Sequence, residues 1–224
     1  MISNWKLGMK ILRYSYGIKT NLFVAAALLG MNVLYIFPNI TTYKGILSGC
    51  MLMSVGLLPT QMLYSLSASN MVQASPCKKR MQTSVPAAVT FGSMALMYLV
   101  AVLERGIIVL VRPDSMGWGA GSLLIQAALM MTVMLYMGIA YKYFVAATLC
   151  FIPALMLLLT RIRVNSIYEW NLLRHGWFSF GMAIILGLAA LAAGALLQYF
   201  LTLLLYRVPL SKAAQVAPLR RELL

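Results

Sequence analysis

Charged residues are scarce in this chain, and their scarcity excludes a soluble globular protein. Only 10% of the 224 residues are charged and 62% are hydrophobic, whereas a soluble domain typically has about 25% charged residues. Such a composition cannot cover a water-facing surface, so lipid must be the solvent. The sequence therefore predicts an all-α polytopic membrane protein that forms one transmembrane domain over residues 1–224.

Residues that bind metals or form disulfides are also few. The chain has a single histidine, His175, and its three cysteines lie far apart, at Cys50, Cys77 and Cys150. Metal sites and disulfide frameworks need clustered ligands, and a thiol inside an apolar run behaves as a small hydrophobic group. We therefore expect no metal site and no cofactor.

Acidic residues are too few and too scattered for an active site. The four of them lie near the ends of apolar runs or in loops: Glu104, Asp114, Glu169 and Glu222. No nucleophile, base and stabilising group can be assembled from them, and the chain lacks the GxxxxGK[ST] motif of an ATP-binding P-loop. We expect no catalytic residue, and we expect that this chain is not an enzyme.

Basic residues, in contrast, are abundant, with 18 Lys and Arg and a formal net charge of +14. Nucleic-acid binding is not expected, because no basic stripe with interleaved aromatic residues occurs. Basic residues that flank membrane spans set the topology of the chain. Placing the N-terminus in the cytoplasm puts about twice as many basic residues inside as outside, so both termini are predicted to be cytoplasmic.

Long apolar runs predict six membrane spans. A helix needs about 20 apolar residues to cross the hydrocarbon core, and the apolar stretch over 120–160 would form a helix of about 60 Å, twice the core thickness. This stretch must fold back, and Lys142 marks the turn. Pro38 is expected to end the first span, and RPDSMGWGAG, from Arg112, is expected to be a loop. The predicted spans are 21–37, 46–66, 86–111, 120–140, 144–160 and 178–206.

Residues 1–20 are predicted to form a helix that lies in the headgroup plane. Hydrophobic residues recur at spacings of three and four, at Ile2, Trp5, Met9, Leu12 and Tyr16, and therefore share one helical stripe. The cations Lys6, Lys10 and Arg13 fall on an adjacent side, and Trp5 favours a membrane interface. This pattern is typical of an interfacial helix with its cations toward anionic lipid. The alternative is a cytoplasmic extension of the first span.

The segment 161–177 is too polar to cross a membrane and too apolar for a free loop. Its hydrophobic residues alternate with Arg161, Arg163, Glu169 and Arg174. Non-spanning backbone at membrane depth survives only against protein or a wet cavity. We expect a short amphipathic or partly re-entrant helix at the outer face, with an ordinary interfacial loop as the alternative.

The connection between the second and third spans, residues 67–85, is longer than the link requires. Its first half is polar and helical in pattern, Pro76 breaks it, and three basic residues follow. A topology signal explains the charges but not the length, whereas a surface for a cytoplasmic partner explains both. The residues expected to form this surface are Asn70, Gln73, Ser75, Pro76, Lys78, Lys79, Arg80 and Gln82.

The whole layout, and SNMVQASPCKKRMQTSVP most closely, resembles an ABC-2 type permease, the membrane subunit of an ATP-binding cassette exporter. The resemblance is one of architecture over essentially the full chain: an in-plane N-terminal elbow helix, six spans, a cytoplasmic coupling segment and a short outer helical element. It implies a separate cytoplasmic ATPase subunit that contacts Asn70 to Thr83, and a second permease subunit in a homodimer or heterodimer. It also implies a multi-pass protein of the bacterial plasma membrane.

Two features bear on cargo and assembly and leave alternatives open. The 17 methionines suit adaptable apolar surfaces, either a pathway for a hydrophobic or peptide-like substrate or ordinary packing. Small residues permit close helix contacts, within one subunit or between two. They include Gly187, Ala190, Ala193 and Gly194.

An ion-coupled secondary transporter or a non-transporting immunity or assembly protein is the alternative function. Ion-coupled carriers often have carboxylates within the membrane, and Glu104 is the single candidate in the predicted spans. We expect Glu104 to lie at the outer boundary in contact with solvent. Adjacent side chains on a helix point about 100° apart, so Arg105 is not expected to face it.

Overall fold

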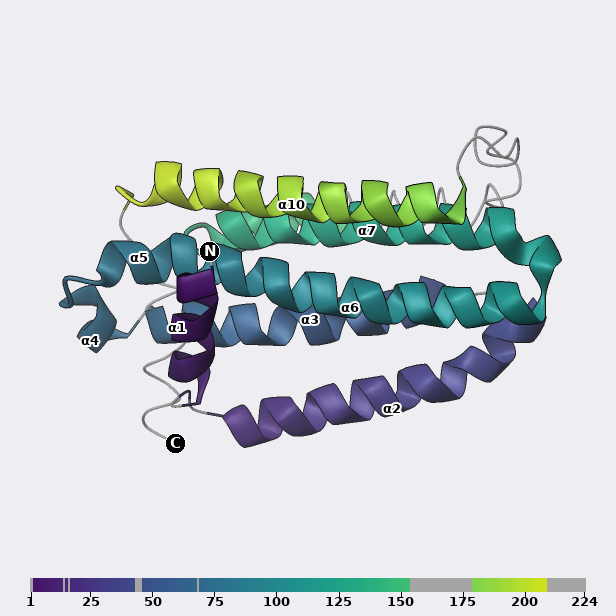
Figure 1. Cartoon of the computed structure of the whole chain (residues 1–224). Helices are drawn as coiled ribbons and strands as arrows, with labels where there is room; N and C mark the ends of the chain where they lie inside the picture. The colour runs from purple at the N-terminus through teal and green to yellow at the C-terminus, as the bar shows by residue number, and fades with distance from the viewer. Residues whose placement is uncertain are drawn as a thin grey trace.

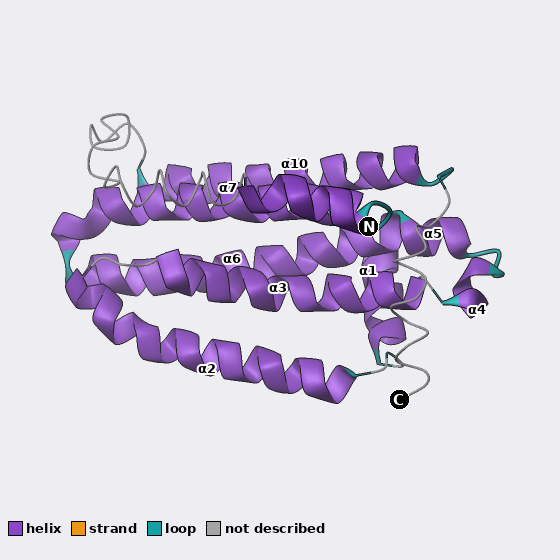
Figure 2. Ribbon diagram, turned by 180° about the vertical axis from the view of Figure 1, so that it is seen from behind, coloured by secondary structure: helices purple, strands orange, loops and turns teal. Residues whose placement is uncertain are grey.

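The computed structural model describes residues 2–13, 15, 17–42, 46–67, 69–153 and 179–208. Within these ranges every regular element is a helix (Figure 2). The long helices are α2 (Ile18–Thr42), α3 (Ile46–Ser67), α6 (Ser84–Val111), α7 (Met116–Ala140) and α10 (Phe180–Leu205). Five described helices are long and apolar enough to cross a membrane. The length and composition of these helices confirm the prediction of an all-helical, multi-pass membrane protein.

Several predicted span ends agree with the helices. The second, third and last predicted spans correspond to α3, α6 and α10 within about two residues at each end. Pro86 is the third residue of α6, as expected for a proline in a first turn. The turn at Lys142 is also confirmed, because α7 ends at Ala140 and a new helix runs over Phe144–Pro153.

Two predicted breaks were wrong. Helix α2 continues past Pro38 to Thr42, and α7 begins at Met116 within the glycine-rich stretch, so the break there is limited to Arg112 and the short helix η1 (Pro113–Ser115). Membrane helices tolerate proline and glycine more readily than soluble ones do. Gly119 also has a packing role, because a side chain there would press on Val109 of α6.

Parts of the predicted topology lie outside the described residues. The fifth predicted span, 144–160, is described only as far as Pro153. The segment 161–177 and the C-terminal tail are not among the described residues. A full crossing by the fifth predicted span, the resulting total of six spans, the outer amphipathic helix and the position of the C-terminus therefore stay predictions.

Helices α3, α6, α7 and α10 form the core of the bundle (Figure 1). Glycines let them approach closely: a side chain at Gly187 of α10 would collide with the ring of Tyr98, and Gly194 lies against Met131 and Met134 of α7. Ala193 is exposed. The two glycines of the small-residue stretch thus pack within this chain, which settles the question that the sequence left open for them.

Helices α1 (Ile2–Leu12) and α2 lie at the side of this core. Helix α1 crosses one end of the bundle, and α2 runs beside α3 with little of its surface buried (Figure 1). Beneath α1 a second, smaller core joins Leu12 to Leu63, Val85 and Val89. The N-terminal helix is shorter than the predicted 1–20, because α1 ends at Leu12 and α2 already begins at Ile18. Its position in a headgroup plane stays a prediction.

Candidate functional site

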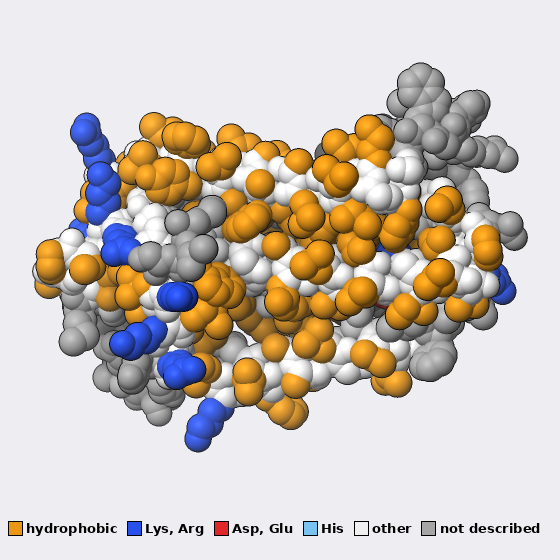
Figure 3. Space-filling view, viewed as in Figure 1, with side chains coloured by type: hydrophobic (Ala, Val, Ile, Leu, Met, Phe, Trp, Pro, Cys, Tyr) orange, Lys and Arg blue, Asp and Glu red, His pale blue; other side chains and the backbone are white. Residues whose placement is uncertain are grey.

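Most cations of the described chain gather at the end of the bundle that carries α1 (Figure 3). Nine of the described basic residues belong to this end: Lys6, Lys10, Arg13, Lys19, Lys78, Lys79, Arg80, Lys142 and Arg207. Arg105 and Arg112 belong to the other end. We call the first the basic end.

The connection between α3 and α6 is folded rather than extended. Within it, α4 (Asn70–Gln73) is followed by a turn and by α5 (Lys78–Gln82). Gln73 Nε2 donates to the Ser67 carbonyl oxygen at 2.7 Å, and the Cys77 amide donates to Ser75 Oγ at 3.1 Å. We call residues 69–83 the coupling segment. Its basic residues lie on a helix, whereas the sequence had indicated only a charged stretch after Pro76.

The eight residues expected to meet a partner fall into two groups. Pro76, Lys79 and Arg80 are exposed, and Lys78 is partly exposed. Gln73 and Ser75 make the bonds that shape the turn, and the side chain of Asn70 is not described. Gln82 is fully buried, because it lies on the side of α5 that faces the bundle. Among the side chains of this segment that the structure describes, the exposed ones are therefore Lys79, Arg80 and Pro76, together with Ala74 and Cys77.

The coupling segment is attached to both neighbouring membrane helices. Met81 of α5 is buried in the small core with Leu63 of α3 and Val85 of α6. Only Thr83 separates α5 from α6, and its hydroxyl donates to the Lys79 carbonyl oxygen at 2.7 Å. Residues 78–111 thus form an almost continuous helical unit of 34 residues, which at 1.5 Å per residue is about 50 Å long.

Helix α1 also touches the coupling segment. Arg80 donates from Nε and Nη2 to Asn4 Oδ1, at 2.9 and 2.6 Å. The sequence did not reveal this contact, because its partners are 76 positions apart. One face of α5 therefore supports α1, while Lys79 remains available to solvent.

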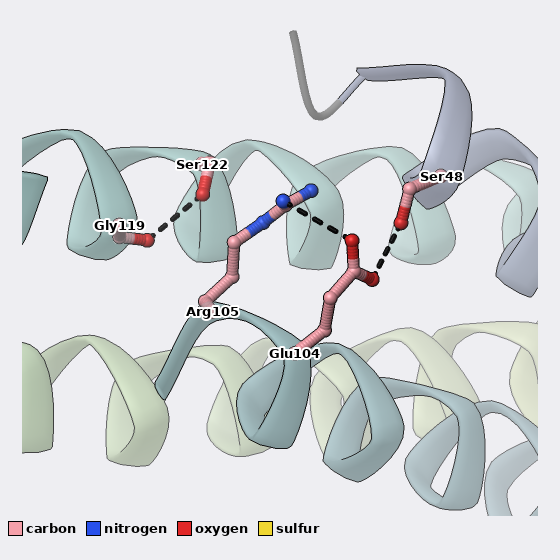
Figure 4. Close-up of polar contacts among 5 residues, drawn as sticks. All are labelled: Ser48, Glu104, Arg105, Gly119 and Ser122. Atoms are coloured by element: carbon pink, nitrogen blue, oxygen red, sulfur yellow. Dashed lines mark hydrogen bonds and ion pairs between the residues drawn. The ribbon is translucent and has the colours of Figure 1, made fainter. Parts of the chain in front are cut away.

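A buried ion pair lies toward the opposite end of α6 (Figure 4). Glu104 and Arg105 are 3% and 1% exposed. Ser48 Oγ of α3 donates to Glu104 Oε2 at 2.6 Å, and Arg105 Nη1 lies 3.4 Å from Glu104 Oε1. The guanidinium carbon also lies 4.9 Å from the ring centroid of Trp118 in α7.

The expectations for Glu104 and Arg105 were wrong. Glu104 is buried rather than solvated, and Arg105 pairs with it although the two are neighbours. Their Cβ atoms do point apart, but both side chains are long enough for the charged groups to meet between α3 and α7. One feature of the sequence could have predicted the pair: a Glu and an Arg are adjacent inside an apolar run, and ionisable residues in membrane spans usually have a partner.

Polar side chains also connect the helices in the interior. Gln198 Nε2 of α10 donates to Tyr64 Oη at 3.1 Å and to Thr90 Oγ1 at 3.2 Å. Thr90 and Thr60 share a hydrogen bond of 2.9 Å. This network joins α3, α6 and α10 near the basic end, so displacement of α6 would also disturb α3 and α10.

No group of three or more metal-ligating side chains occurs among the described residues. Comparison with family models, with curated proteins and with solved structures finds no match to the chain.

Proposed function

We propose that the chain is the permease subunit of an ATP-binding cassette exporter of the bacterial plasma membrane. The observation that carries this proposal is the coupling segment: a folded, basic, exposed element joined almost without interruption to a membrane helix. A simple topology signal requires the charges but not two short helices with their own hydrogen bonds. A surface that receives force from a partner requires both.

The coupling segment is suited to pass motion into the membrane. Because Met81 and Gln82 are buried against the bundle, α5 cannot move without displacing its neighbours. Movement of α5 would be carried along α6 toward the buried Glu104–Arg105 pair and, through Thr90 and Gln198, to α10. In this proposal a separate ATPase subunit supplies the motion, and a second permease subunit completes the pathway for a hydrophobic or peptide-like substrate.

The orientation follows from the same end of the molecule. The cations of the basic end favour a cytoplasmic location, since cytoplasmic loops carry an excess of Lys and Arg. The coupling segment, at this end, would then face a cytoplasmic ATPase. The charge distribution and the docking role therefore both favour a cytoplasmic location of the coupling segment.

Co-purification tests the proposal directly. The tagged chain is extracted from its native membranes in mild detergent, and copurifying subunits are labelled with 8-azido-ATP. We expect a nucleotide-binding subunit with the unmodified chain and its loss with Lys79→Glu/Arg80→Glu. Asn4→Ala is the matched control, because it breaks the Arg80 contact with α1 and leaves both cations in place. Retention with Asn4→Ala and loss with the charge reversal supports docking.

The orientation of each variant is measured in the same preparation. In a Cys50→Ser/Cys150→Ser background, a membrane-impermeant maleimide reports the exposed Cys77 in sealed vesicles of known orientation. If no nucleotide-binding subunit is recovered from correctly inserted protein in a detergent that preserves other membrane complexes, the exporter proposal fails. A non-transporting immunity or assembly protein then becomes the better explanation.

The buried Glu104 favours one alternative, an ion-coupled secondary transporter. Ionisable residues inside spans often mark ion pathways. In that case Glu104→Gln would abolish proton- or sodium-driven uptake into proteoliposomes in the absence of ATP. An exporter subunit would show no such ATP-independent transport.

A further inference from the structure

A groove opens between α1, α2, α3 and α6 at the basic end. Its volume is about 760 Å³, which is within the range of about 300 to 1,000 Å³ typical of ligand pockets. Most of its wall is apolar, with Ala25 of α2, Leu58 and Pro59 of α3, and Leu96 and Met97 of α6 among the lining residues. The groove belongs to a single chain, so it needs no partner subunit.

Apart from Asn21 of α2 and Ser93 of α6, the polar lining residues belong to α1 or to the residue that follows it. Lys6, Lys10 and Arg13 line the groove, and all three are exposed. Glu104, the one carboxylate whose side chain the structure describes, lies 12 residues along α6 from Gly92, about 18 Å away along the helix. Within the described part of the chain, therefore, no acidic side chain neutralises these cations.

The hydroxyl of Ser93 has no free proton to donate to an occupant. Its single proton is directed to the Gly56 carbonyl oxygen at 2.7 Å, and the Thr90 carbonyl oxygen at 3.2 Å is the alternative acceptor. Ser93, the serine among the lining residues, therefore adds no hydrogen-bond donor to the apolar wall. The contrast between an apolar wall and a cationic rim is what an amphiphile with an anionic head would match.

The rim is held in place by close packing of α1 on α6. Gly8 lies over Val85 and Val89, and the indole of Trp5 covers Gly92 so closely that a Cβ at either glycine would collide with these side chains. The predicted hydrophobic stripe included Met9, but Met9 is exposed and lines the groove beside the cations. The glycine contact sets this rotation of α1 and turns Lys6 and Lys10 toward the groove.

We propose that this groove binds one anionic phospholipid from the surrounding membrane. One of its two acyl chains lies along the wall formed by α2, α3 and α6, and its phosphate is held by Lys6, Lys10 and Arg13. Charge complementarity selects the headgroup, and basic pockets between membrane helices are known to bind such groups. This inference does not rest on the exporter assignment, because the groove is complete in one chain.

Native mass spectrometry of the full chain tests the proposal. The detergent-solubilised protein is titrated with phosphatidylglycerol and with phosphatidylcholine that has the same acyl chains. We expect one tightly bound phosphatidylglycerol. The affinity for phosphatidylcholine should be lower by a factor of at least about ten. Lys6→Gln/Lys10→Gln should weaken phosphatidylglycerol binding by a similar factor. Lys79→Gln/Arg207→Gln removes the same charge outside the groove and should leave binding unchanged.

A second pair of variants tests the apolar wall. Ala25→Phe places a ring in the groove and should weaken both lipids, whereas Ala26→Phe, at an exposed position outside the lining, should not. Equal binding of the two lipids would overturn the proposal. An equal loss in both charge variants, or in both phenylalanine variants, would overturn it as well, because the binding would then be non-specific.

Discussion

Arg105 and Glu104 are adjacent in the chain and yet form a buried pair, with Nη1 of one 3.4 Å from Oε1 of the other. Ser48 holds the second carboxylate oxygen, and the Trp118 ring lies beside the guanidinium. Two opposite charges side by side make a locally neutral cluster, which is the form in which charges are tolerated inside a membrane. The cluster lies at the contact of α3, α6 and α7, so its integrity bears on how these helices stay together.

Removing one member of this pair should cost more than removing both. Glu104→Gln leaves a buried arginine without its carboxylate, and we expect a loss of about 3–5 kcal/mol in the free energy of unfolding. Arg105→Gln should cost a comparable amount. The double variant Glu104→Gln/Arg105→Gln leaves no net buried charge and should be more stable than either single variant. Thermal unfolding in detergent, analysed as a double-mutant cycle, measures the coupling. Additive losses would contradict the pairing.

Gly92 should be required for the position of α1. Gly92→Ala places a methyl group against the Trp5 indole, and overpacking of this kind costs about 1–3 kcal/mol. We expect α1 to detach from α6 and trypsin to cleave faster after Lys6 and Lys10. Gly30→Ala is the matched control, because Gly30 of α2 faces open space and alanine is the better helix former there. The same cleavage rate in both variants would show that the Trp5 contact does not hold α1.

Lys142 should make stability depend on pH in the alkaline range. Its Nζ donates to the Val208 carbonyl oxygen at 2.7 Å, and burial, with a smaller contribution from nearby Lys78, lowers its pKa to about 8. The unfolded chain has the ordinary lysine pKa of about 10.4. Between these values the unfolded state binds more protons, so the stability that this residue contributes rises with pH, and below pH 8 it is constant.

The comparison with Lys142→Met isolates this effect. Unfolding is measured in detergent from pH 7 to pH 10.5, and the difference between the unmodified chain and the variant is taken at each pH. That difference should grow in favour of the unmodified chain by at most about 1.4 kcal/mol per pH unit above pH 8. Parallel stability curves for the two proteins would mean that Lys142 titrates normally.

Local patterns were good predictors of where the long helices lie. The ends of α3, α6 and α10 and the turn at Lys142 follow from apolar length and from single charges. The errors at Pro38 and at the glycines after Arg112 have one cause. Breaker rules derived for chains in water lose force where the backbone has no other donor or acceptor available and must stay helical.

The candidate sites were less predictable. The coupling segment was found from its length and charge, but its division into a buried Gln82 and an exposed Lys79 depends on how α5 packs on the bundle. The bond of Arg80 to Asn4 and the rotation of α1 toward the groove depend on contacts between residues far apart in the chain. A local hydrophobic pattern predicts neither the Arg80–Asn4 bond nor the rotation of α1.

The sequence by itself determined the solvent of this protein, its helical class, the approximate extent of its long helices and the concentration of cations near α1, because apolar length and charge are local properties. Only the tertiary structure decided that Glu104 and Arg105 are buried together, that Gly187 and Gly194 pack inside one chain, and that Lys6 and Lys10 border a groove. These depend on which face of each helix meets its neighbour. In a helix that is apolar on nearly every side, that choice is made by close contact at small residues and by pairing of polar ones.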